Sequence, residues 1–192
     1  MNIKVVITGA TGFIATALYR RLEKKERYSI VKVTRSKNKP DFHSVDCYRD
    51  TPDGDILIHL GEDPDRARVN QIGETYKQGT GEVIDALVKA NYRKIIYCSS
   101  AIVYGDQGRK PYNENMPTCA IDIYSKAKLE NEMRVLDVGG IVVRFSNVIG
   151  LGMAKNNVLS EIMDQLSKPD PLIVNNIKPI RDFIWIDDVV DA

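Results

Sequence analysis

Tyr124 and Lys128 stand four positions apart in the segment YSKAK, and this spacing could support proton transfer. Residues at i and i+4 of a helix share one face. An ammonium beside a phenol favours the phenolate and lowers the pKa of the tyrosine, so the pair could exchange a proton with a substrate hydroxyl or carbonyl. Ser99 and Ser100 stand at the end of a strand-like run, and a serine there could hydrogen-bond the same substrate oxygen. The YxxxK spacing is common by chance, and the alternative is an ordinary helix surface.

The segment ITGATGFIA (7–15) has the composition of a phosphate-binding turn. Gly9 permits a tight turn, Gly12 lets the backbone approach a pyrophosphate, and Ala15 is small enough to pack a helix against a strand. The N–H groups and the dipole of the following helix would hold the phosphates. The alternative is an ordinary strand-to-helix turn, but the place between a buried strand and an amphipathic helix favours dinucleotide binding.

The residues after the second strand-like run indicate which dinucleotide would bind. NAD-preferring folds place an acid there for the ribose hydroxyls, whereas this chain has Arg35 and Lys37. A guanidinium pairs with a 2′-phosphate, which mildly favours NADP over NAD; the alternative is a solvated basic loop. Asp46 and Cys47 could contact the adenine amino group or only cap a strand. Gly61 would let the backbone pass close to the cofactor.

Short β-branched runs alternate with helical patterns along the first 150 residues. This alternation predicts a parallel sheet covered by helices on both faces, which is a doubly wound α/β fold of the Rossmann type. The expected strands cover 3–8, 29–34, 42–47, 55–60, 94–99 and 140–145, and the expected helices cover 15–25, 70–90 and 121–136.

The regular alternation of strand and helix patterns ends after Gly150. We expect a helix at 154–167, short strands at 172–174 and 183–186, and a helix beginning at Asp187. The chain therefore divides into a dinucleotide-binding domain at 1–150 and the start of a substrate-binding portion at 151–192. Residues after Asp188 are expected to fray, because the helix that they begin has no expected packing partner.

Composition excludes several other classes of function. The 27 Lys and Arg residues nearly balance the 26 Asp and Glu residues, and no basic block suggests nucleic-acid binding. The absence of a long apolar run or a signal-peptide pattern predicts a cytoplasmic protein with no membrane partner. The three cysteines lie far apart without a CxxC pattern, so we expect no metal site. His59 is expected to be a core residue.

Together these features resemble the extended short-chain dehydrogenase/reductase family, and within it the NAD-dependent epimerase/dehydratase group that acts on nucleotide sugars. The matching segments follow the family's order along the whole chain: ITGATGFIA, DILIHLG, IIYCSSAIVYG, YSKAKLENE, VVRFSNVIG and RDFIWIDDVVDA. The resemblance implies Ser100, Tyr124 and Lys128 as catalytic residues, and Asn147 and Arg181 as contacts to the nucleotide sugar. The expected cofactor-binding residues are Gly9, Thr11, Gly12, Phe13, Ile14, Arg35, Asp46, Cys47, Leu60, Gly61, Ser99, Tyr124, Lys128 and Phe145.

Several positions depart from the family's pattern. Arg35 replaces the acid of NAD-preferring members. Dehydratases of the family carry an acid just after the catalytic serine or threonine, whereas Ala101 and Ile102 supply none, which leaves 4-epimerisation or ketone reduction. Glu62 and Tyr76 replace the small or amide residues that are frequent at positions near the nicotinamide.

Family members are longer than this chain and complete a substrate domain beyond the RDF segment. We therefore expect most of that domain to be missing, so that the 192 residues bind cofactor but turn over a sugar nucleotide poorly. The resemblance also implies a homodimer formed by the helices expected at 70–90 and 121–136, although these helices could simply cover the sheet. The alternative function is that of a catalytically inactive or regulatory NAD(P)-binding protein.

Overall fold

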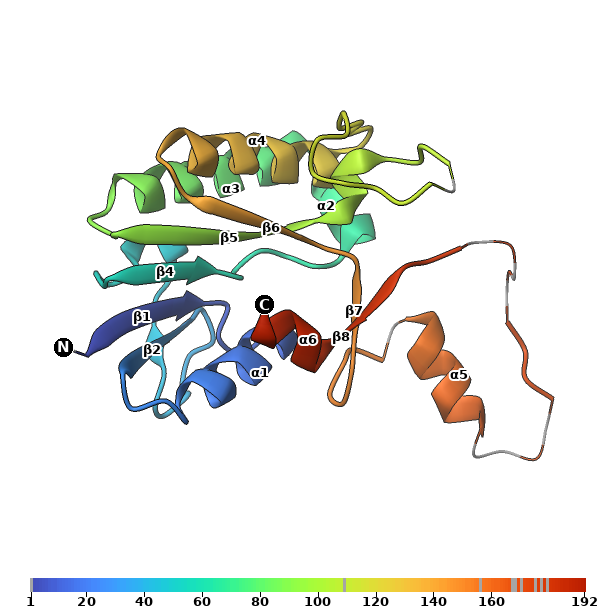
Figure 1. Cartoon of the computed structure of the whole chain (residues 1–192), viewed down its shortest axis with the longest axis horizontal. Helices are drawn as coiled ribbons and strands as arrows, with labels where there is room; N and C mark the ends of the chain where they lie inside the picture. The colour runs from blue at the N-terminus through green and yellow to red at the C-terminus, as the bar shows by residue number, and fades with distance from the viewer. Residues whose placement is uncertain are drawn as a thin grey trace.

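Six parallel strands form the central sheet of the computed structural model, which describes residues 2–192 except 109, 156, 167, 168, 170, 175, 177 and 179. The strand order is β3-β2-β1-β4-β5-β6, so the direction of winding reverses between β1 and β4 (Figure 1). The strands are β1 (Ile3–Thr8), β2 (Tyr28–Thr34), β3 (His43–Ser44), β4 (Ile56–His59), β5 (Lys94–Ser100) and β6 (Ile141–Phe145). This topology confirms the predicted doubly wound α/β fold.

Helices cover both faces of the sheet (Figure 1). Successive side chains of a strand point to opposite faces, and β1 therefore contributes to two cores. Val6 packs with Ile84 of one helical layer, whereas Val5 and Ile7 pack with Ala15 of the other. The first layer contains α2 (Arg66–Ile72), α3 (Glu74–Lys89) and α4 (Ile123–Asp137), and the second contains α1 (Phe13–Leu22).

The helix expected at 70–90 is divided into α2 and α3. The division falls at Gly73, whose φ of +75° is a conformation that other residues rarely adopt. The strand expected at 42–47 pairs with β2 only over the two residues of β3. After β3 the chain turns into a short 3₁₀ helix, Tyr48–Asp50, which ends the pairing.

The chain beyond β6 forms a second, two-stranded sheet from β7 (Asn147–Ile149) and β8 (Phe183–Trp185). Between them, α5 (Val158–Leu166) begins later than expected, and residues 172–174 form no strand. The expectation that the end of the chain frays is wrong. The last helix, α6 (Ile186–Asp191), buries Ile186 and Val189, lies beside α1 in Figure 1, and joins it through an ion pair between Asp191 and Arg21.

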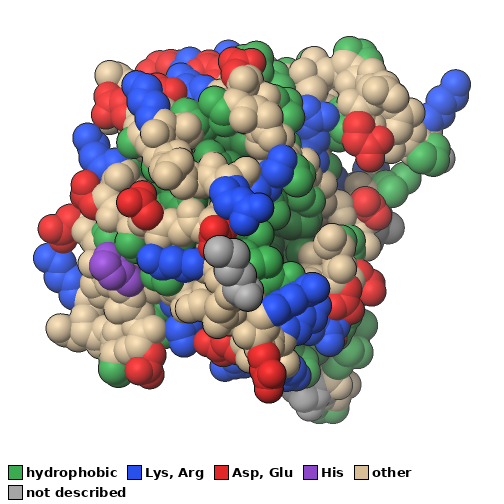
Figure 2. All heavy atoms as spheres, turned by 60° about the vertical axis from the view of Figure 1, so that its left-hand side comes forward, with side chains coloured by type: hydrophobic (Ala, Val, Ile, Leu, Met, Phe, Trp, Pro, Cys, Tyr) green, Lys and Arg blue, Asp and Glu red, His purple; other side chains and the backbone are tan. Residues whose placement is uncertain are grey.

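Charged side chains of both signs are interspersed over the face shown in Figure 2, in agreement with the balanced composition. Within the described residues, no helix is long and apolar enough to cross a membrane. The same part of the chain holds no group of three or more His, Cys, Asp or Glu side chains arranged to bind a metal ion.

Candidate functional site

The glycine turn between β1 and α1 has the geometry of a close backbone approach. Gly9 has a φ of +65°, and a Cβ atom there would lie 2.4 Å from the carbonyl oxygen of Leu60. A Cβ atom on Gly12 would lie 3.0 Å from the carbonyl oxygen of Gly9. No described side chain caps α1 at Gly12, and its first turn carries no acid. The first N–H groups of α1, at Phe13 and Ile14, therefore lie where an anion could accept their hydrogen bonds.

Arg35 follows β2 at the same edge of the sheet. Its side chain is exposed, and its guanidinium carbon lies 5.1 Å from the centre of the Tyr48 ring. That ring also explains why position 61 is a glycine, because a Cβ atom on Gly61 would lie 2.4 Å from the ring. Thr11, in the glycine turn, lies close to the end of β2, with its Oγ1 3.4 Å from the Oγ1 of Thr34.

Asp46 and Cys47 lie just beyond β3 and already have polar partners. Lys37 Nζ lies 3.3 Å from an oxygen of Asp46, and both side chains are exposed. Arg49 Nε donates to the Sγ atom of Cys47 at 3.2 Å. Burial would raise the pKa of the Cys47 thiol, but the hydrogen bonds and charge of Arg49 outweigh it and lower the pKa below its ordinary value.

The first turn of α4 is fixed by a capping box. The Asp122 carboxylate accepts from the Ser125 backbone N–H at 2.9 Å, while the Asp122 N–H donates to the Ser125 hydroxyl at 3.2 Å. From α2, Asn70 accepts from the Tyr124 N–H at 3.0 Å, and Arg66 donates to Asp122 at 2.5 Å. The turn that carries Tyr124 is thus held from two sides.

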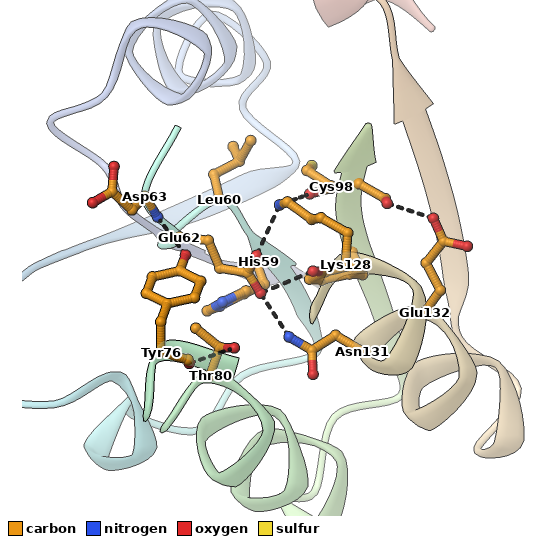
Figure 3. Close-up of polar contacts among 12 residues, drawn as sticks. His59, Leu60, Glu62, Asp63, Tyr76, Thr80, Cys98, Lys128, Asn131 and Glu132 are labelled. Carbon is orange, nitrogen blue, oxygen red and sulfur yellow. Dashed lines mark hydrogen bonds and ion pairs between the residues drawn. The ribbon is translucent and has the colours of Figure 1, made fainter. Parts of the chain in front are cut away.

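Lys128 lies one turn further along α4 and points to the ends of two strands (Figure 3). Its side chain is only 9% exposed. The ammonium donates at 2.9 Å to the carbonyl oxygen of Cys98 in β5, and lies 2.9 Å from Oε2 of Glu62, which follows β4. An ammonium has three N–H donors, so these two contacts leave one N–H of Lys128 for a further acceptor.

Glu62 is the acidic partner of this lysine and is itself 6% exposed. Its Oε1 accepts from the Tyr97 hydroxyl at 2.8 Å and from Asn131 Nδ2 at 2.9 Å. Burial would raise the pKa of Glu62, but the charge of Lys128 and these hydrogen bonds lower it. Burial would likewise lower the pKa of Lys128, but Glu62 raises it. The two groups therefore form a charged pair beneath the carboxyl edge of the sheet.

Burial changes the pKa expected for Tyr124. Lys128 alone was expected to lower the pKa of the phenol. Burial raises that pKa, the charge of Lys128 lowers it and the charge of Glu62 raises it, with a net increase above the ordinary value. Tyr124 is therefore a phenol at neutral pH.

The two serines at the end of β5 have different environments. Ser99 is buried and donates to Glu132, which also binds Arg144 of β6 through a contact of 2.6 Å. Ser100 is only partly buried, and its Oγ accepts from the Ile102 N–H at 3.3 Å. Ser100 pairs in register with Phe145 at the end of β6. Of the two serines, Ser100 is therefore the one whose hydroxyl donates to no other group within the described residues.

The residues implied as substrate contacts lie in the second sheet. The Asn147 side chain donates to the carbonyl oxygen of Asp182 at 2.8 Å, and the Asn147 N–H donates to the same oxygen at 3.1 Å. Arg181 is exposed, and its guanidinium donates to the carbonyl oxygen of Ile180 at 3.2 Å. Asn147 and the segment of Arg181 are thus brought together through Asp182.

Sequence reasoning identified Glu62 as a departure from the family's pattern but did not identify it as the partner of Lys128. Asn131 was not singled out, although it lies three residues after Lys128 and therefore near it on α4. The buried pair could have been suspected from an acid at the carboxyl end of one strand and a lysine expected at the same edge.

Curated proteins are similar to this chain over much of its length. GDP-6-deoxy-D-talose 4-dehydrogenase of Aggregatibacter actinomycetemcomitans is 28% identical over 200 residues, which cover 98% of this chain and 68% of that protein. An undecaprenol-linked N-acetylglucosaminyl diphosphate 4-epimerase of Escherichia coli O157:H7 is 27% identical over 141 residues, which cover 69% of this chain and 42% of that protein.

Solved structures share the fold. UDP-glucose 4-epimerase of Thermotoga maritima, solved with UDP-glucose, superposes with a TM-score of 0.84 at 18% identity and covers 98% of this chain and 71% of its own. UDP-glucuronic acid 4-epimerase of Bacillus cereus, solved with UDP-glucuronic acid and NAD, has a TM-score of 0.78 at 21% identity, with coverage of 98% and 71%. The model of the NAD dependent epimerase/dehydratase family matches residues 5–192, and the chain therefore belongs to that family.

Proposed function

We propose that this chain forms the cofactor-binding and catalytic part of an NAD(P)-dependent epimerase or ketoreductase that acts on a nucleotide sugar. The observation that carries the proposal is the contact of Lys128, on α4, with the carboxyl ends of β4 and β5. The glycine turn of Gly9 ends a neighbouring strand at the same edge. One relative is named as a GDP-6-deoxy-D-talose 4-dehydrogenase and another as a UDP-glucose 4-epimerase, which supports this substrate class.

The residues present fit a dinucleotide at both ends. Gly9 and Gly12 form a turn that added Cβ atoms would crowd, and the uncapped start of α1 would hold the pyrophosphate. The remaining N–H of Lys128 would donate to a ribose hydroxyl. When bound, the nicotinamide group would accept a hydride from the sugar carbon or return it.

The chain's own residues would move the proton. The Tyr124 hydroxyl would exchange a proton with the substrate oxygen, and the Ser100 hydroxyl would donate a hydrogen bond to that oxygen. Ala101 and Ile102, which follow Ser100 in a 3₁₀ turn, offer no base to remove a carbon-bound proton. This favours epimerisation or ketone reduction over 4,6-dehydration.

Arg35 supports a preference for NADP. Its exposed guanidinium stands over the Tyr48 ring, and no ion pair of this side chain occurs within the described part of the chain. A 2′-phosphate could therefore be its partner. Lys37, by contrast, is already paired with Asp46.

A homodimer also remains a proposal. The side chains of Met133 and Leu136 on α4 are about half exposed, at 51% each. A second copy of α3 and α4 would cover them. Sedimentation of the 192-residue chain at increasing concentration measures this association.

The experiment that tests the function is single-turnover hydride transfer. The 192-residue chain is loaded with NAD⁺ or NADP⁺ and mixed with UDP-, GDP- and dTDP-sugars, and formation of the reduced nicotinamide is followed by absorbance. Tyr124→Phe should slow the transfer at least about 100-fold, because it removes the proton-transfer group. Cofactor affinity, measured by calorimetry, should stay nearly unchanged. Equal transfer rates for wild type and Tyr124→Phe would disprove the catalytic role of Tyr124.

A second candidate function is a cofactor-binding protein without catalysis. The observation that favours it is the occupation of Lys128 by the carboxylate of Glu62. This candidate predicts cofactor binding in the calorimeter and no hydride transfer with any sugar of the panel.

A further inference from the structure

The carboxylate of Glu62 receives contacts from three side chains on two elements, β5 and α4. Tyr97 of β5 donates to one oxygen. Asn131 of α4 donates to the same oxygen, and Lys128 faces the other at 2.9 Å (Figure 3). Neither Tyr97 nor Asn131 is a residue that the proposed reaction uses. A buried carboxylate that receives two hydrogen bonds and one ammonium is held in a single position.

Glu62 also determines where the ammonium of Lys128 lies. The lysine side chain has four rotatable bonds, and Cys98 alone would give it one acceptor. The second acceptor, Glu62, follows a different strand, so the ammonium is held between β4 and β5. The lysine then directs its remaining N–H away from these two partners.

The position of Glu62 has a second consequence, because its negative charge acts on Tyr124. The charged and titratable groups that act on Tyr124 are Lys128, Glu62, Asp63, Arg66 and Tyr76.

Two of these groups are paired with opposite charges, and the arginine of each pair is exposed to solvent. Asp63 pairs with Arg68 at 2.6 Å, and Arg66 pairs with Asp122 at 2.5 Å. Surface pairs of this kind exert weak fields. Among the charges that act on Tyr124, the buried pair of Lys128 and Glu62 is therefore the least screened, while burial itself makes the largest contribution and raises the pKa of the phenol.

We propose that Glu62 is a positioning residue for the proposed reaction, in which its carboxylate holds the Lys128 ammonium and balances its charge beside Tyr124. The inference rests on the function proposed above for Tyr124 and Lys128. A balanced lysine leaves Tyr124 in the phenol form, which donates a proton to a carbonyl oxygen. A lysine without Glu62 would favour the phenolate, which accepts a proton from a hydroxyl.

The test is a titration of Tyr124 in the 192-residue chain by NMR, with tyrosines labelled at Cζ with ¹³C. Tyr124→Phe assigns the signal among the nine tyrosines. Glu62→Gln keeps the size of the side chain and removes its charge. The titration midpoint of Tyr124 should fall by about one pH unit or more, because Lys128 is then unopposed. An unchanged midpoint would overturn the proposal.

Three further variants control the result. Glu62→Asp keeps the charge and should keep most of the wild-type midpoint. Glu82→Gln removes an exposed carboxylate of α3 and should leave the midpoint of Tyr124 in place. If Glu62→Gln does not fold, the double variant Glu62→Gln/Lys128→Met removes both buried charges and leaves neither alone.

The double variant has its own expected result. Its Tyr124 midpoint should return to within about half a pH unit of the wild type, because the two opposite contributions are both gone. A midpoint well above or well below that of the wild type would show that the two charges do not balance, and the proposal would be wrong.

The titration needs neither cofactor nor substrate. It can therefore succeed while the hydride-transfer assay fails, in which case Glu62 positions Lys128 in a protein with another function. If hydride transfer depends on Tyr124 but the titration midpoint of Tyr124 is unchanged in Glu62→Gln, the proposed function stands and this inference does not.

Discussion

Acidification should destabilise this protein through His59, a histidine buried in the core. His59 is 2% exposed, stacks on Tyr97 with ring centres 6.2 Å apart, and meets the edge of Tyr48 at 5.9 Å. Its Nδ1 atom lies 2.8 Å from the hydroxyl oxygen of Thr8. Burial lowers the pKa of His59 from 6.5 to about 4, since the surroundings accommodate the neutral ring and not the imidazolium.

The sign and size of the effect follow from proton linkage. Between the two pKa values the unfolded chain binds a proton at this histidine and the folded chain does not, so stability falls as the pH falls from 6.5 to about 4. One pKa unit corresponds to about 1.4 kcal/mol, and the shift is therefore equivalent to a loss of about 3 kcal/mol by pH 4. Above pH 6.5 both states hold His59 neutral and the effect disappears.

Denaturant unfolding between about pH 7 and pH 4 measures this loss. The comparison is between the wild type and His59→Gln, because carboxylates also titrate in this range and affect both proteins alike. The wild type should lose about 3 kcal/mol more than the variant on acidification. His43→Gln, which removes an exposed histidine, should follow the wild type. Parallel losses in wild type and His59→Gln would refute the reasoning.

Three other substitutions test the site and its supports. Arg35→Asp should reverse the cofactor preference. Calorimetry should show that the wild type binds NADPH more tightly than NADH and that the variant loses about tenfold or more in NADPH affinity. Equal affinities of the wild type for the two cofactors would count against a role of Arg35 in this preference. Gly61→Ala should cost about 1–3 kcal/mol in unfolding free energy, because its methyl group meets the Tyr48 ring; an unchanged denaturation midpoint would contradict the packing. Asp122→Ala should cost about 1 kcal/mol by removing the cap of α4. Burial would raise the pKa of Asp122, but the hydrogen bonds from Ser125 outweigh it and lower the pKa. The stabilisation by this cap is therefore present above pH 4 and is lost on acidification. An Asp122→Ala variant whose stability depends on acid pH as the wild type's does would disprove the role of the cap.

The sequence alone determined the features that depend on neighbouring residues. Apolar β-branched runs separated by helical patterns predicted the parallel sheet, because strand and helix periodicity are local properties. The turn of Gly9 and Gly12 was readable for the same reason, since its glycines act on their own backbone. The spacing of Tyr124 and Lys128 predicted one helix face, and α4 confirms it.

Local signals also failed where local conformation was ambiguous. The expected helix at 70–90 contains a favourable periodicity on both sides of Gly73, and only the positive φ of that residue divides it. The start of α4 was placed two residues early, because the cap is Asp122 and its reciprocal bond with Ser125 decides the boundary.

Tertiary structure decided what depends on distant residues. Glu62 and Lys128 are 66 positions apart, and nothing in either local sequence predicts that their side chains meet at 2.9 Å. Their contact requires β4 and β5 to be neighbours in the sheet and α4 to pack across their ends. The same holds for α6, which packs on α1 through Asp191 and Arg21, 170 positions apart. Long-range packing brings such charges together and also buries Tyr124, and burial raises the pKa of this phenol, whereas local spacing alone predicted that Lys128 would lower it.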